Sequence, residues 1–173
     1  MNLAQIRQKT AYSEQPKNDL KMAGRIFSQH IFQGAVAVTL SLKQSFEVVT
    51  NYGTYNKRLD RDECKRIARN FQKKLNQLAY GNAAKKYQKS LKYLISVESG
   101  SGGLNLHLHM VIGEFPQHIK LGEIERLILR AKNKVPEMNK EYKVKICYDT
   151  GWNEYVVKTI GKTNTDSILW DLA

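Results

Sequence analysis

The sequence predicts an α+β domain in which helices pack on one face of an antiparallel sheet. Short runs rich in β-branched and aromatic residues alternate with two longer segments of helical periodicity. Two of the strand-like runs are neighbours, joined by a Gly/Ser-rich connection that can fold the second strand back antiparallel. The length of 173 residues suits one domain with a real core.

The first part of the chain is expected to add an extension and the first strands. Residues 1–33 are polar and are expected to form an N-terminal extension, with the folded domain over 34–173. GAVAVTLSLK, at 34–43, reads as a buried strand rich in Val, Thr and Leu. The segment 46–59 is expected to add another strand, followed by a turn at Asn51–Gly53.

A helix and two strands are expected next. Asp60 is a good N-cap, and Gly81 can end the helix that follows. The apolar residues between them recur at helical spacing: Ile67, Ala68, Phe71, Leu75, Leu78 and Ala79. LKYLISVE, at 91–98, and LNLHLHMVIG, at 104–113, then read as the second and third strands.

The last part of the chain is expected to complete a second β-α-β half. An amphipathic helix is expected over 121–133, a fourth strand over 141–149, and a third helix or helical turn over 151–162. The order is β-α-β-β-α-β-α, two β-α-β halves joined by a hairpin. This order predicts a ferredoxin-like or RRM-like sheet with helices on one face, which leaves the other face to carry a site.

Charge is the unusual bulk property, at +12 with a pI near 9.7. Such an excess favours an anionic partner, nucleic acid first and an acidic membrane surface second. No apolar run approaches the ~20 residues of a membrane span, and the N-terminus lacks the apolar core of a signal peptide. Cys64 and Cys147 are far apart, which fits a reducing cytosol and argues against a zinc ribbon.

Residues 57–92 concentrate the positive charge, with twelve Lys and Arg and only three acids. A solvated helix face and contact with a DNA backbone explain this imbalance about equally well. The residues predicted to contact DNA are Lys43, Arg58, Arg61, Lys65, Arg66, Arg69, Lys73 and Lys74.

His107 and His109 are the first candidate site residues. Two imidazoles at this spacing on a strand point to the same face, although a polar stripe or a satisfied histidine pair explains them equally well. Glu98 ends the preceding strand, so the turn brings it near both histidines if the register permits. One carboxylate and two imidazoles predict a site for Mn²⁺ or Mg²⁺, while zinc or nickel could bind the same ligands more tightly.

Tyr155 and Lys158 are the second candidate site residues. Three positions apart, they share a face if this segment is helical. A tyrosine can attack phosphorus as a covalent nucleophile, and a lysine can hold a phosphate or favour the phenolate. The same spacing is also typical of an amphipathic helix with its aromatic residue packed on a sheet, and eight other tyrosines compete for the role.

Four features occur in a fixed order: VTLSL at 38–42, Glu98, His-Leu-His at 107–109, and YVVK at 155–158. This order resembles the HUH endonuclease superfamily, in particular rolling-circle replication initiators with a single catalytic tyrosine. The resemblance covers about residues 34–162. The antiparallel, ferredoxin-type sheet of that family agrees with the order of elements expected above.

The resemblance implies a catalytic mechanism. Glu98, His107 and His109 would hold a metal that polarises a scissile phosphate in single-stranded DNA. Tyr155 would attack that phosphate and stay attached to the 5′ side, and Lys158 would neutralise charge. The freed 3′-hydroxyl could prime a polymerase.

The implied partners are single-stranded DNA or an origin hairpin, with a helicase and a polymerase from the host or the element, because no GxxxxGK[ST] loop is present. The expected location is the cytoplasm of a prokaryotic cell, with its plasmid or phage DNA, or the nucleus of a eukaryotic host.

Two alternatives stay open. A transposase or relaxase would use the same chemistry, although relaxases usually place the tyrosine near the N-terminus, where Tyr12 is the only early candidate. A non-catalytic, RRM-like binder of single-stranded nucleic acid would need exposed aromatic residues on its sheet.

Overall fold

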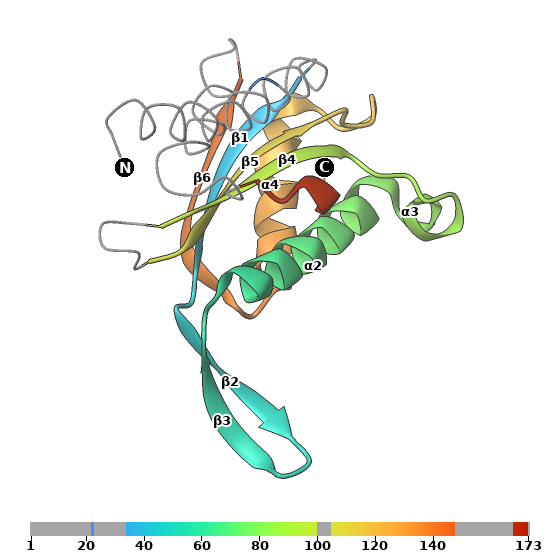
Figure 1. Ribbon diagram of the computed structural model, residues 1–173. Helices are drawn as coiled ribbons and strands as arrows, with labels where there is room; N and C mark the ends of the chain where they lie inside the picture. The colour runs from blue at the N-terminus through green and yellow to red at the C-terminus, as the bar shows by residue number, and fades with distance from the viewer. Residues whose placement is uncertain (1–21, 23–33, 100–104, 148–167, 173) are drawn as a thin grey trace, which may run out of the picture.

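The computed structural model describes residue 22 and residues 34–99, 105–147 and 168–172 (Figure 1). Within these ranges four strands form one sheet in the order β4-β5-β1-β6, and every neighbouring pair is antiparallel. The strands are β1 (Val36–Leu42), β4 (Lys92–Glu98), β5 (His107–Gly113) and β6 (Met138–Ile146). This order is that of two interleaved β-α-β units joined by the β4–β5 hairpin, so the predicted α+β, ferredoxin-type class is confirmed.

Two long helices, α2 (Arg61–Tyr80) and α4 (Leu121–Lys132), pack on the same face of the sheet (Figure 1). The predicted ends of α2 are confirmed. Asp60 caps the helix by accepting a hydrogen bond of 2.8 Å from the backbone N–H of Glu63. Gly81, at φ 57°, ends it in a left-handed conformation that glycine adopts readily. A short helix that the sequence analysis did not predict, α3 (Asn82–Lys86), follows directly.

The core lies between the sheet and these helices. Alternate residues of the strands point into it, among them Leu40, Ile95 and Met110, and they meet Phe71 of α2 and Ile128 of α4. All five are fully buried. Because side chains alternate along a strand, the intervening residues point to the opposite face. We call that opposite face, as formed by Thr39, Ser41, Ser96, Glu98, His107 and His109, the site face.

A two-stranded hairpin projects from the body of the molecule (Figure 1). It consists of β2 (Ser45–Thr50) and β3 (Gly53–Arg58), paired to each other as a separate sheet. The sequence predicted one strand followed by a turn, and the structure has a strand on each side of that turn. Gly53, at φ 131°, begins the second strand.

The remaining differences concern the ends of elements. β6 begins at Met138, ahead of the expected 141, and β5 begins at His107 rather than at 104. Ile168 forms an antiparallel bridge with Ser96 beside β4, and a short 3-10 helix, η2 (Trp170–Leu172), follows it. The expected helix over 151–162, and the expected extension over 1–33 apart from Met22, lie outside the described residues.

Candidate metal centre on the site face

The strand register brings the predicted metal ligands together. Glu98 on β4 lies directly opposite His107 on β5, and Ser96 lies opposite His109. On the other side of β5, Thr39 of β1 is the partner of His109. The expectation that the next strand lies antiparallel and places Glu98 near both histidines is therefore confirmed.

The ligand atoms of these residues converge. The distance from Glu98 Oε2 is 3.2 Å to His109 Nε2 and 3.9 Å to His107 Nε2, and the three ligand atoms all lie within 4.8 Å of one another. Glu98 and His109 are buried, whereas the side chain of His107 keeps 26% of its surface exposed. The cluster is therefore enclosed on one side and accessible from the side of His107.

Each imidazole is held through its other nitrogen. His107 Nδ1 lies 2.9 Å from the carbonyl oxygen of Asn105, which can only accept, so Nδ1 donates to it and Nε2 is the nitrogen turned toward Glu98. His109 Nδ1 lies 3.0 Å from the hydroxyl of Thr39. Metal-binding histidines are typically oriented in this way by a second partner. One carboxylate and two oriented imidazoles make a group that could hold a metal ion, and we call Glu98, His107 and His109 the metal cluster.

Gln44 fixes the chain just ahead of His107. Its side chain donates to the carbonyl of Leu106 at 3.0 Å and accepts from the N–H of Leu106 at 2.8 Å, and it also donates to the carbonyl of Leu42. Asn105, at φ 60°, supplies the carbonyl that orients His107. These supports were not predicted from the sequence, because a supporting role for Gln44 becomes visible only once β1 and β5 are known to be neighbours.

A polar cleft of about 440 Å³ adjoins His107. Ser41, Gln44, Asn105 and Asn139 line it with hydrogen-bonding groups, and Glu141 is the one acidic residue among its described lining residues. The hydroxyl of Ser41 donates to Glu141 over 3.4 Å. The cleft thus offers several hydrogen-bonding groups to a ligand beside the metal cluster.

Two lysines that were not predicted as site residues also lie on the site face. Lys143 of β6 pairs with Thr39, and Lys145 pairs with Ala37, so both point to the same side as the histidines. Both are exposed. Their signal in the sequence is the alternation of EYKVKI, which has meaning only once β6 is known to lie beside β1.

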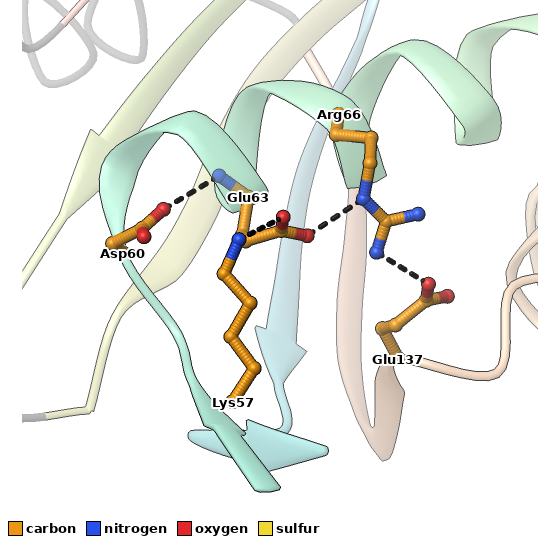
Figure 2. A network of polar contacts seen from close by, with 5 residues as sticks. All are labelled: Lys57, Asp60, Glu63, Arg66 and Glu137. Atoms are coloured by element: carbon orange, nitrogen blue, oxygen red, sulfur yellow. Dashed lines mark hydrogen bonds and ion pairs between the residues drawn. The ribbon is translucent and has the colours of Figure 1, made fainter. Parts of the chain in front are cut away.

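Most of the predicted DNA-contacting residues lie elsewhere. Six of the eight are on α2, which covers the face opposite the metal cluster: Arg61, Lys65, Arg66, Arg69, Lys73 and Lys74. Arg66 is paired with two glutamates (Figure 2), and Lys65 and Arg69 both contact Asp171. Lys73 and Lys74 are exposed. The structure therefore does not bring this basic helix and the metal ligands together on one face.

The other two predicted DNA contacts, Lys43 and Arg58, are exposed at the base of the hairpin. Tyr155 and Lys158 lie outside the described residues, so their catalytic role stays a prediction.

No family model, curated protein or solved structure matches this chain. Among the residues that the structure describes, no helix is both long and apolar enough to cross a membrane.

Proposed function

We propose that this protein is a metal-dependent nickase and strand transferase that cuts single-stranded DNA at a specific site and initiates rolling-circle replication. The observation that carries the proposal is the convergence of Glu98 Oε2 with the Nε2 atoms of His107 and His109. A metal ion bound to these three side chains would draw charge from a phosphate and ease attack on its phosphorus.

The supporting residues prepare the site for such a ligand. Asn105 and Thr39 hold the two imidazoles with Nε2 turned toward Glu98, so little reorganisation is needed. Lys143 and Lys145 add positive charge on the same face, where a DNA backbone would pass. The cleft beside His107 offers hydrogen-bonding groups to a nucleotide next to the scissile phosphate.

Tyr155 is the proposed nucleophile. Its phenol oxygen forms a bond to phosphorus while the bond from phosphorus to the 3′ oxygen breaks. The phenol gives up its proton, and the departing 3′ oxygen takes one up. Lys158 stabilises the negative charge that develops. The phosphotyrosine bond retains much of the energy of the broken bond, so a 3′-hydroxyl can later displace the tyrosine without ATP.

The metal cluster does not separate a replication initiator from a transposase or relaxase with the same chemistry. It does favour an enzyme over an RRM-like binder, which stacks bases on aromatic residues of its sheet. In the described strands of the four-stranded sheet, the Tyr and Phe side chains are those of Tyr93 and Tyr142, and both lie on the helix side. Tyr93 is in the core, and the ring of Tyr142 lies 5.5 Å from Lys132 Nζ of α4.

The test of this function is a search for the covalent adduct. Wild-type protein, Mn²⁺ and 3′-labelled single-stranded DNA carrying candidate origins should give a slow, protease-sensitive band on a denaturing gel. Tyr155→Phe should abolish both the band and cleavage, whereas the matched Tyr148→Phe variant should retain them. Mass spectrometry should place the nucleotide on Tyr155.

Other outcomes redirect the proposal. An adduct on Tyr12 would favour a relaxase-like arrangement. Cleavage by Tyr155→Phe at the wild-type rate, with no adduct, would identify water as the nucleophile. Equal cleavage in EDTA and in Mn²⁺ would refute the metal-dependent mechanism.

A further inference from the structure

The β2–β3 hairpin has no role in the proposed chemistry, yet its form suggests one. It stands out from the body (Figure 1), and its strands pair without interruption from Ser45–Arg58 to Thr50–Gly53. Near its tip Val49 is 76% exposed, and Tyr52 is fully exposed. An isolated two-stranded sheet is marginally stable in water, so a hairpin held away from the core calls for a firm attachment.

Four residues that we call the hairpin joint supply that attachment: Lys57, Glu63, Arg66 and Glu137 (Figure 2). Lys57 Nζ donates to Glu63 at 2.7 Å, and Arg66 contacts both Glu63 and Glu137 at 2.6 Å. The Arg66 guanidinium also lies 5.8 Å from the ring centroid of Phe46 on β2. The joint therefore ties the base of the hairpin to α2 and to the chain just before β6, which gives the hairpin a set direction.

The two faces of the hairpin differ in chemistry. Phe46 and Lys57 are cross-strand partners, and both contact α2 residues of the joint, so their face turns toward the body. The other face, which we call the outer face, carries Ser45, Glu47, Val49, Thr54, Asn56 and Arg58. Ser45, Thr54 and Asn56 are uncharged residues with hydrogen-bonding groups. Glu47 contributes one negative charge and Arg58 one positive charge.

We propose that the outer face of the hairpin enters the major groove of duplex DNA beside the nick site and reads base edges there. A two-stranded ribbon fits the major groove, which is about 12 Å wide. The amide of Asn56 suits adenine, Thr54 can bond several bases, and Val49 suits the methyl group of thymine. Lys43 and Arg58, exposed at the hairpin base, are placed to meet phosphates along the groove. The inference rests on the proposed function for its choice of DNA as the partner.

Charge and shape favour duplex DNA over other occupants. The chain carries +12, which suits a polyanion, and exposed Lys43 and Arg58 bring positive charge to the hairpin base, while the outer face as a whole is neutral. The outer face has Val49 as its only large apolar side chain, too little for a stable protein interface. The major groove of an RNA duplex is too narrow and deep for side chains to read. The duplex could be a DNA hairpin stem or the double-stranded region that flanks the nicked strand.

The experiment selects duplexes from a randomised DNA library with the full-length protein, in EDTA so that nothing is cut. Wild-type protein should enrich a defined sequence. Asn56→Ala should lower the preference for that duplex over a scrambled one by roughly 5- to 150-fold, the usual contribution of one good base contact. Asn82→Ala, the same change at another exposed asparagine, should leave the preference unchanged. Circular dichroism should show an unaltered fold in both variants.

The outcomes separate this inference from the proposed enzyme. Selective duplex binding that Asn56→Ala weakens, together with no nicking of single strands, would keep the hairpin role and refute the enzyme. Nicking by a protein that enriches no duplex, or an Asn56→Ala variant with wild-type preference, would overturn the hairpin role alone. Equal binding to duplex RNA would also overturn the hairpin role. So would hairpin substitutions that change the oligomeric state, measured by light scattering, and leave the preference between DNA sequences unchanged.

Discussion

Two glutamates on opposite sides of the sheet show how differently one residue type can be used. Glu63 lies in the hairpin joint and Glu98 in the metal cluster, and their side chains are similarly shielded, at 13% and 9% exposed. Around Glu63 the neighbours are the cations Lys57 and Arg66, which donate to its two oxygens. Around Glu98 the described neighbours include two imidazoles, which present ring nitrogens.

The difference lies in the kind of groups that surround each carboxylate. The hairpin joint balances its charges with its own side chains, so it can act as a structural attachment without a ligand. In the metal cluster, a carboxylate and two imidazoles, when the rings are neutral, offer electron pairs to a cation bound among them. Glu98 with a protonated histidine would make an ordinary ion pair through the same atoms, so substitutions are needed to distinguish a structural pair from a metal site.

The largest expected effect comes from removing an imidazole. His107→Ala or His109→Ala should lower cleavage by more than about 100-fold, because changes to the supporting shell alone cost about 10- to 100-fold. Calorimetry should show loss of Mn²⁺ binding in both variants, while DNA binding is mostly retained. Glu98→Ala should act more mildly if water fills its position. Wild-type Mn²⁺ affinity in both histidine variants would place the metal elsewhere and make the cluster a structural pair.

A smaller effect is expected from the residue that orients His109. Thr39→Val keeps the shape of the side chain and removes the hydroxyl that lies 3.0 Å from Nδ1. Mn²⁺ affinity should fall by about 10- to 100-fold, with the melting temperature little changed. Thr54→Val on the hairpin is the matched control and should bind Mn²⁺ like wild type. An unchanged affinity in Thr39→Val would show that the strand alone orients His109.

The two sides of the sheet can also be compared as DNA-binding surfaces. Replacing Lys143 and Lys145 with Ala should weaken single-stranded DNA binding and reduce the salt slope by about 0.7 per lost phosphate contact. The same double change at Lys73 and Lys74, which are exposed on α2, tests the surface that the sequence predicted. We expect the larger loss for the β6 pair, because it shares a face with the metal cluster. The reverse result would place the DNA on the helix side.

Much of the fold could be predicted from the sequence because its signals are local. The Asp60 cap, the apolar spacing of α2 and the Gly/Ser connection after Glu98 depend on neighbouring residues, and each predicted the right element. The candidate metal ligands could be predicted for the same reason, since Glu98 and His107 are close in the sequence.

The rest depends on contacts between distant segments. Thr39 supports His109 from a separate strand, and Lys143 shares the site face only through the β1–β6 register. The hairpin joint likewise unites residues as far apart as Arg66 and Glu137. The basic residues of 57–92 were an ambiguous signal, because the sequence does not show which of them form ion pairs with acidic side chains. Arg66 and Arg69 form such ion pairs, whereas Lys73 is exposed.

The smallest effect is expected at the hairpin joint, and its pH dependence distinguishes charge from packing. The hydrogen bond from Lys57 lowers the pKa of Glu63 below its usual value of about 4.5, aided by Arg66 and opposed by burial. A lowered pKa in the folded protein means that the ionised carboxylate stabilises the fold at pH values above that usual value. This stability is lost as pH falls through the lowered pKa.

Glu63→Gln should therefore cost about 1 kcal/mol in the free energy of unfolding at neutral pH, since the site is partly exposed. Urea unfolding of both proteins should show this difference shrinking below pH 4.5. Glu125→Gln, at an exposed position of α4, is the control and should cost little at any pH. A loss for Glu63→Gln that stays constant down to acidic pH would show that side-chain packing, rather than charge, holds the hairpin to α2.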